Sequence, residues 1–219
     1  MANIICYDAG FVHLGYVVAE LPESPDLKPR LIHLGTSHAE LPKKSERALR
    51  NKSVTYKNVH RILKQVDAVK RLHRQYKPVG YFIEMPHGGA KGALAIRGMS
   101  FATAYLATAI HLLAPKVCCT IFLPNQVKKV VTGDRNASKL DIARAVMAYW
   151  PEIGAADWPG FKVIAKKKVK KGKKIVVEDK AIAHDATDAG AVCITATKHD
   201  SYMSLFYGEG NQCLNDLDL

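Results

Sequence analysis

Four acidic residues stand where a purely structural role would not require a carboxylate. Asp8 ends a short apolar run over residues 3–8, and Glu84 ends another over residues 79–84. Asp185 and Asp188 open the last predicted helix, three residues apart and therefore on one face. Because strands that end at the same edge of a sheet bring their last side chains together, we expect these four carboxylates to converge.

Converging carboxylates repel one another unless a cation neutralises them. Their oxygens are the ligands that Mg²⁺ and Mn²⁺ prefer. Two such ions, about 3.5–4 Å apart, activate a water molecule and stabilise the leaving oxygen of a phosphodiester. In a chain of 219 residues with a net charge of +12, this combination predicts a nuclease that uses two Mg²⁺ ions, or Mn²⁺, in each active site.

Each carboxylate taken alone also has a structural interpretation. Asp8 precedes a predicted turn, which is a common position for aspartate. Asp185 is a candidate N-cap, and Asp188 complements the dipole of the same helix. Glu84 has no such alternative, because the apolar residues 81–83 lead directly into it. The set of four, more than any single member, favours catalysis.

The positive charge is concentrated in two blocks. Residues 42–79 contain 12 basic and 2 acidic residues, and residues 162–180 contain 9 lysines and 2 acidic residues. The blocks indicate a polyanion-binding surface. The alternatives are a solvated helix face with a flexible loop or, less favoured because no apolar face accompanies the lysines, a membrane surface. Five cysteines without a CxxC pair argue against a disulfide framework and a zinc finger, and the first residues do not resemble a signal peptide, so we expect a soluble cytoplasmic protein.

The order of predicted elements indicates one α/β domain over residues 1–219, with a mixed sheet and helices on its faces. Residues 93–113 are rich in small side chains, which suits either a core helix or an oligomer interface. A basic β-hairpin is expected at 162–177. Strands are expected at 3–8, 14–20, 31–35, 79–84 and 117–123, and helices at 53–76, 93–113, from Pro124, from Ala137 to Trp150 with Asn136 as N-cap, and from about 184 to 198.

Four motifs, in the same order along the chain, resemble those of RuvC-type Holliday junction resolvases. Asp8–Tyr16 is similar to the family's opening Asp-Pro-Gly motif with its following Thr-Gly, and Phe82–Glu84 to its second acidic motif. Residues 127–139, with Lys128, Lys129, Gly133 and Lys139, resemble its Val-Lys…Gly…Ala-x-Lys segment. Asp185–Ala189 resembles its closing Asp-Ala-Ala-Asp-Ala, so the likeness extends from residue 3 to about 198.

This resemblance implies an RNase H-like fold, a homodimer, and Mg²⁺-dependent resolution of four-way DNA junctions by paired symmetric nicks. It implies that Asp8, Glu84, Asp185 and Asp188 are the catalytic metal ligands. It also implies that Lys139 lies nearest the scissile phosphate and offsets its developing charge.

The chain departs from the family pattern at several places. Ala9 replaces the usual proline, and Leu14 replaces a threonine. His87 stands where the family has an aromatic residue that enters the junction, so a stacking contact by His87 competes with the role of an ordinary loop histidine. The hairpin at 162–177 is an insertion relative to the family.

Basic residues beside these motifs are the candidates for DNA contacts. Lys128, Lys129 and Arg135 precede a helix start, where backbone N–H groups also favour phosphate; an exposed helix face is the alternative for the two lysines. The hairpin lysines are expected to contact phosphates unless the hairpin is a disordered, solvated loop. The full candidate set is His87, Lys91, Lys128, Lys129, Arg135, Lys167, Lys168, Lys170, Lys171 and Lys173.

Two other functions remain open from the residues alone. One is a different RNase H-like nuclease that acts on flaps, other branched DNA or structured RNA. The other is a nucleic-acid-binding protein on the same fold without catalysis, which the presence of all four acidic residues argues against.

Overall fold

The computed structural model describes residues 2–39, 53–85, 93–159, 161–171, 174–182 and 185–207. At residues 94, 95 and 207, and along the two strands between 162 and 182, it describes the backbone alone.

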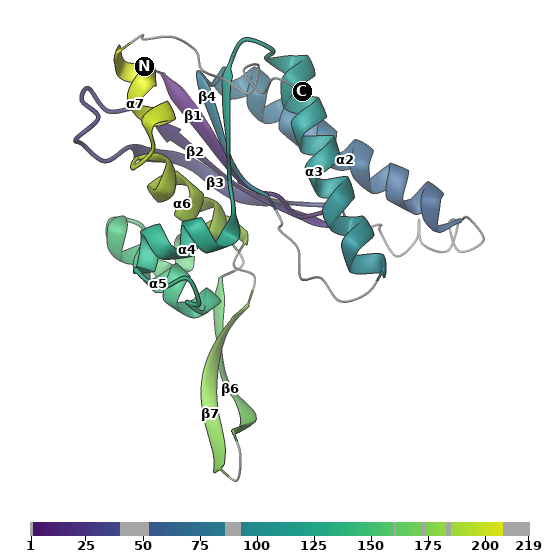
Figure 1. Cartoon of the computed structure of the whole chain (residues 1–219), viewed down its shortest axis with the longest axis vertical. Helices are drawn as coiled ribbons and strands as arrows, with labels where there is room; N and C mark the ends of the chain where they lie inside the picture. The colour runs from purple at the N-terminus through teal and green to yellow at the C-terminus, as the bar shows by residue number, and fades with distance from the viewer. Residues whose placement is uncertain are drawn as a thin grey trace.

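One mixed sheet contains five strands: β1 (Asn3–Asp8), β2 (His13–Glu20), β3 (Arg30–His38), β4 (Gly80–Glu84) and β5 (Cys118–Phe122). Their order is β3-β2-β1-β4-β5 (Figure 1). β2 pairs antiparallel with both β1 and β3, whereas β1, β4 and β5 run parallel. The mixed α/β sheet expected from the sequence is therefore confirmed, and β3 is longer than expected.

Helices cover both faces of this sheet (Figure 1). Because successive side chains of a strand point to opposite faces, Ile5 and Tyr7 of β1 enter one core and Ile4 and Cys6 the other. The first face packs against α2 (Val54–Tyr76) and α3 (Ala93–Leu113), as the residues of its core indicate. The second packs against α4 (Pro124–Thr132), α5 (Lys139–Tyr149), α6 (Asp185–Ala196) and α7 (Asp200–Tyr207).

Local sequence signals set the ends of several helices. The Ser53 side chain caps α2 by accepting a hydrogen bond from the Tyr56 amide at 3.2 Å, and Lys77 ends that helix with a φ of 44° just before Pro78. Pro124 occupies the first turn of α4, as expected. Gly133 ends α4 with a φ of 79°, a conformation that favours glycine.

Two helix boundaries differ from the sequence prediction. Asn136 is not the N-cap of α5, because its amide donates to Asp134 Oδ1 at 2.8 Å within a turn. Ser138 caps the helix instead, since Asp141 three residues later completes a capping box with it. The last expected helix ends at Ala196, and α7 follows as a separate helix whose Tyr202 is buried against the sheet.

Small residues of α3 pack in the hydrophobic core of the chain. Ala102 and Ala109 are buried, together with Tyr105, Leu106 and Ile110, in the core on the α2 side of the sheet. Of the two interpretations of this helix, the core helix is what the structure shows for these side chains.

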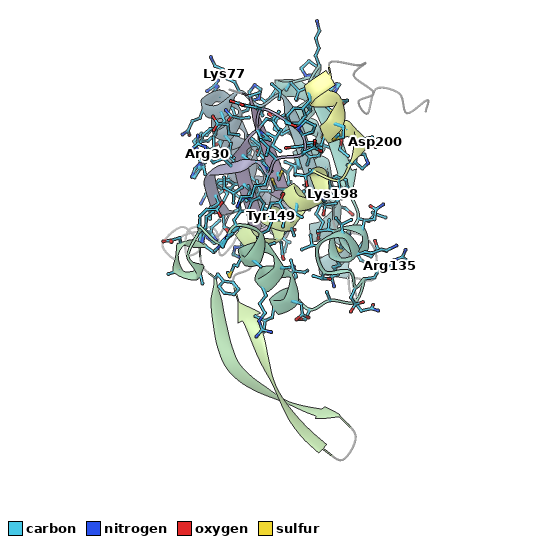
Figure 2. All side chains as sticks on the ribbon, turned by 90° about the vertical axis from the view of Figure 1, so that its left-hand side faces the viewer. Arg30, Lys77, Arg135, Tyr149, Lys198 and Asp200 are labelled. Atoms are coloured by element: carbon cyan, nitrogen blue, oxygen red, sulfur yellow. The ribbon has the colours of Figure 1, made fainter. Side chains whose placement is uncertain are left out.

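The basic hairpin forms a second, two-stranded antiparallel sheet of β6 (Lys162–Lys171) and β7 (Lys174–Ile182). It projects from the end of the molecule that carries α5, in both views (Figures 1 and 2). The predicted hairpin is thus confirmed and extends five residues further than expected, to residue 182. None of the helices in the described residues is long and apolar enough to cross a membrane.

Candidate active site

The alternation of side chains along the strands places Asp8 and Glu84 together. Asp8 follows Ile4 and Cys6 on the face that α6 covers, and Glu84 follows Phe82 on the same face. Because β1 and β4 are parallel and in register, Asp8 is the direct cross-strand partner of Glu84. Both carboxylates therefore leave the same edge of the sheet toward the same helices.

The first turn of α6 lies against β2, the strand that flanks Asp8 on the side opposite to β4. Gly15 of β2 pairs with Asp8. A Cβ atom at Gly15 would lie 2.1 Å from the Asp185 carbonyl oxygen, so only glycine permits this approach. The glycine thereby lets the start of α6 lie beside β1, and Asp188, one helical turn later, is buried with 3% of its surface exposed.

Lys139, the first residue of α5, reaches the same place from another helix. Its Nζ forms an ion pair and hydrogen bond with Asp188 Oδ2. The capping box formed by Ser138 and Asp141 fixes the start of the helix and hence the position of Lys139. Lys139 is also the first residue of α5, and the N-terminus of a helix favours an anion, as an ammonium group does.

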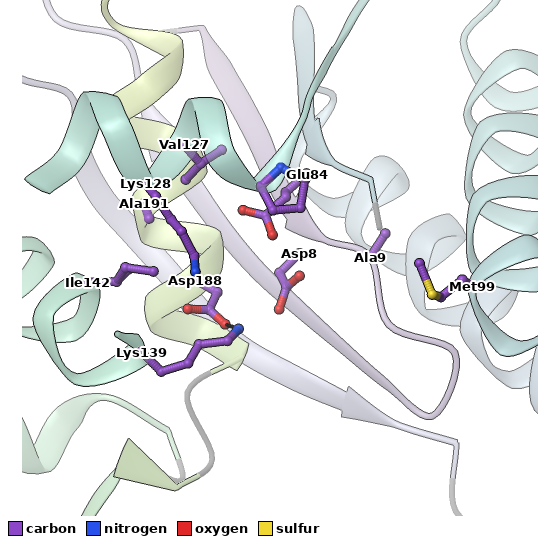
Figure 3. A pocket seen from close by; sticks show the side chains of 11 residues that line it. Asp8, Ala9, Glu84, Met99, Val127, Lys128, Lys139, Ile142, Asp188 and Ala191 are labelled. Atoms are coloured by element: carbon purple, nitrogen blue, oxygen red, sulfur yellow. Dashed lines mark hydrogen bonds and ion pairs between the residues drawn. The ribbon is translucent and has the colours of Figure 1, made fainter. Parts of the chain in front are cut away.

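These side chains line a cleft of about 300 Å³ (Figure 3). Asp8, Glu84 and Asp188 provide its carboxylates, and Lys128 and Lys139 its ammonium groups. Figure 3 shows Lys128 and Lys139 directed toward Asp188, with Asp8 and Glu84 opposite them. The remaining wall consists of Ala9, Met99, Pro124, Val127, Ile142 and Ala191.

Burial and mutual repulsion raise the pKa of two carboxyl groups in the cleft. Desolvation, followed by the charge of Asp188, raises the pKa of Glu84 from 4.5 to about 7, while Lys139 and Lys128 act in the opposite direction. The pKa of Asp8 is raised well above its usual range by desolvation and then by Asp188, with smaller contributions from Glu84 and Asp185. Lys139 has a raised pKa because the charges of Asp188 and Asp8 outweigh its own desolvation. The cleft therefore favours an added positive charge.

The donor set suits a hard divalent cation, because it consists of carboxylate oxygens whose repulsion such a cation relieves. As the side chains lie here, no three His, Cys, Asp or Glu residues in the described ranges are close enough to hold one metal ion. The Lys139 ammonium instead provides the counter-charge of Asp188. The chemistry of the residues thus fits Mg²⁺ or Mn²⁺, and the ion pair with Lys139 offsets the charge of Asp188.

Of the predicted catalytic residues, the structure brings Asp8, Glu84, Asp188 and Lys139 into one cleft. Asp185 does not line it, although its charge acts on Asp8. The backbone of Asp185 packs on Gly15 at the start of α6, beside the strand that carries Asp8.

The predicted DNA contacts divide into three groups. Lys128 lines the cleft. Lys129 and Arg135, which are close to Lys128 in the sequence, are exposed, and Figure 2 shows Arg135 at the surface. His87, Lys91 and Lys173 lie outside the described residues. Lys167, Lys168, Lys170 and Lys171 lie on β6, whose backbone alone is described.

Sequence analysis did not single out Gly15 as a residue that builds the site, nor Met99 as part of the cleft. The role of Gly15 could have been predicted from the sequence, because a glycine inside a β-rich run often marks the close approach of another backbone. The place of Met99 could not have been predicted, since it lies in the apolar helix α3, whose orientation depends on tertiary packing.

The comparisons with known proteins place this geometry in a known fold. No protein-family model matches the sequence, and no curated protein does. The structure is similar to T. thermophilus RuvC in complex with Holliday junction substrate, with a TM-score of 0.57, 19% identity, and coverage of 93% of this chain and 97% of that chain. It is also similar to a Thermus thermophilus RuvC structure, with a TM-score of 0.56, 19% identity, and coverage of 94% and 96% of the two chains. The RNase H-like fold and the resemblance to RuvC are therefore confirmed at the level of the fold.

Proposed function

We propose that this protein is a Mg²⁺-dependent endonuclease that resolves four-way DNA junctions. The observation that carries the proposal is the register of β1 and β4, which places Asp8 beside Glu84 and opposite the ion pair of Asp188 with Lys139. Acidic side chains with raised pKa values in a cleft that also holds lysines suit phosphodiester hydrolysis on a polyanion. The likeness of the fold to a RuvC in complex with Holliday junction substrate supports a four-way junction as that polyanion.

Each residue of the cleft has a separate role in this proposal. Asp8, Glu84 and Asp188, which line the cleft, together with Asp185, which lies outside the lining but whose charge acts on Asp8, would hold two Mg²⁺ ions. When bound, the ions supply an activated water and charge stabilisation at the phosphate. Lys139 offsets the negative charge that develops on the phosphate. Lys128, at the rim of the same cleft, attracts and orients the strand to be cut.

The deciding experiment is a cleavage assay on three DNA substrates of matched sequence. An immobile four-way junction, a flap and a linear duplex are incubated with the protein in Mg²⁺ and, separately, in EDTA. We expect paired nicks in the junction only with Mg²⁺, leaving a 5′-phosphate and a 3′-hydroxyl, and little cleavage of the duplex. Equal cleavage of flaps, or a preference for structured RNA, would instead indicate another nuclease of the RNase H-like group, and binding without cleavage would indicate a non-catalytic DNA-binding protein.

Paired nicks also require two cleavage sites, and we propose that a homodimer provides them. Ile96 and Leu112 of α3 are exposed, as are Val59 and Leu63 on α2. Val59 and Leu63 are four residues apart and therefore share one face of α2, whereas Ile96 and Leu112 point to different sides of α3. We expect the α2 pair to lie in the contact between two copies of the chain. Leu63→Asp should shift sedimentation from dimer to monomer, and a parent that is monomeric and fully active at micromolar concentration would contradict the proposal.

The hairpin is expected to contact the phosphates of the junction arms, away from the cleft. Lys167, Lys168, Lys170 and Lys171 all lie on β6. Replacing the four with Ala should lower the slope of log affinity against log salt by about 0.9 for each phosphate that a lysine no longer neutralises. Turnover at saturating substrate should change little. Replacement of the same four by Arg is the matched control, because it keeps the charge; an unchanged slope in the Ala variant would mean that the hairpin has no part in recognition.

A further inference from the structure

The turn at residues 9–12, which follows Asp8, is hydrogen-bonded to side chains of α2 and α3. These two helices cover the face of the sheet opposite to the one that carries the Asp8 carboxylate. The Tyr105 hydroxyl of α3 donates a hydrogen bond to the Gly10 carbonyl at 2.9 Å. The Gln65 amide of α2 donates to the Val12 carbonyl at 3.0 Å and to the Ser37 carbonyl, near the end of β3, at 3.2 Å. Two side chains from different helices therefore bind the main chain of one four-residue turn.

Both donors are buried and polar, which makes their targets specific. Gln65 has 0% and Tyr105 4% of its surface exposed, so neither can exchange its partner freely for water. Because both bind carbonyl oxygens, they fix the path of the backbone and not the rotamer of a neighbour. Burial, with a smaller effect from the charge of Asp8, raises the pKa of Tyr105, so its hydroxyl remains a donor at neutral pH and lies within electrostatic reach of Asp8.

The backbone of Asp8 is tied directly to this turn. The Gly10 amide donates to the Asp8 carbonyl at 3.1 Å, and the Ala9 amide donates to the Glu84 carbonyl at 3.2 Å. A Cβ atom at Gly10 would lie 1.9 Å from the His13 carbonyl oxygen, so the turn is too tight for another residue. A shift of Gly10 or Val12 would therefore move Asp8 relative to Glu84.

We propose that Tyr105 and Gln65 are positioning residues that aim the Asp8 carboxylate by holding the turn at residues 9–12. The catalytic consequence rests on the proposed nuclease function. Neither residue lines the cleft, so both act through the backbone of the turn and not on the substrate. Because small misplacements of a reacting group can cost about 10²-fold in rate, loosening the turn should affect turnover more than binding.

A matched pair of tyrosine variants tests this proposal. Tyr81 is also buried, with 0% exposed, and its hydroxyl makes a comparable hydrogen bond to His73 Nδ1 at 2.7 Å, on α2 and not on the turn. We expect Tyr105→Phe to lower kcat for junction cleavage by about 10-fold, to leave KM unchanged, and to raise the Mg²⁺ concentration needed for half-maximal rate. Tyr81→Phe, which removes an equivalent hydrogen bond, should keep the parent's kcat and Mg²⁺ requirement.

Hydrogen exchange provides a second measurement that does not depend on activity. Amides at residues 9–13 should exchange faster in Tyr105→Phe than in the parent or in Tyr81→Phe. Gln65→Leu should do the same and should also speed exchange around residues 37–39. If the parent cuts no junction, the nuclease proposal fails, while the exchange rates still decide whether these residues hold the turn. Unchanged exchange in Tyr105→Phe, or faster exchange with an unchanged kcat in an active enzyme, would overturn the positioning role.

Discussion

Asp8→Asn is expected to reduce junction cleavage by at least about 10²-fold while leaving junction binding intact or tighter. The substitution nearly preserves the shape of the side chain but removes its negative charge. Asp8 is the carboxylate that lies in register with Glu84 at the edge of the sheet, so its charge is central to any cation held there. Cleavage in Mg²⁺ and junction binding in EDTA are measured side by side.

Asp67→Asn serves as the control for this variant, because it removes one carboxylate from the exposed side of α2. It should cut at the parent's rate, which would separate a local effect in the cleft from a general change in charge. If Asp8→Asn also cuts like the parent, Asp8 is only a turn residue and the proposed active site is wrong.

The free energy of unfolding of the metal-free protein is expected to decrease between pH 4.5 and 7 because of the Glu84 carboxyl group. In this range Glu84, whose pKa is raised to about 7, holds its proton in the folded protein, whereas its usual pKa of 4.5 lets the unfolded chain release it. Deprotonation therefore favours unfolding, and the stabilisation present below pH 4.5 is lost as pH rises through 7. The difference between the two pKa values corresponds to at most about 3 kcal/mol in the free energy of unfolding. The raised pKa of Asp8 acts in the same direction.

Urea unfolding in EDTA at pH 5, 6, 7 and 8 measures this decrease by comparison with Glu84→Gln, which cannot ionise at that position. Relative to the parent, the variant should become more stable as pH rises, by up to the same amount. Mg²⁺ should restore stability to the parent at pH 8 more than to the variant, since the deprotonated carboxylate is the form that binds a cation. A difference between the two proteins that is independent of pH would contradict the burial and repulsion assigned to Glu84.

Several parts of the fold could be predicted from the sequence because they depend on neighbouring residues. The apolar runs that end at Asp8 and Glu84 predicted both strands, and the three- and four-residue spacing of apolar residues predicted α2. Pro124 predicted the start of α4, and the two β-rich segments on either side of residues 170–173 predicted the hairpin. The separate helix α7 was not predicted, because burial of Tyr202 against the distant sheet, and not a local pattern, sets its position.

The sequence by itself determined which carboxylates end strands and open the last helix, since strand and helix periodicities are local. Only the tertiary structure decided how they meet. The pairing of Asp188 with Lys139, the contact of Gly15 with the start of α6, and the bond from Tyr105 to Gly10 each join segments that are distant in the chain. These contacts follow from the register of two strands and from the packing of helices on a sheet, and neither is encoded within a short window of residues. The same packing separated Asp185 from the lining of the cleft, although it is only three residues from Asp188.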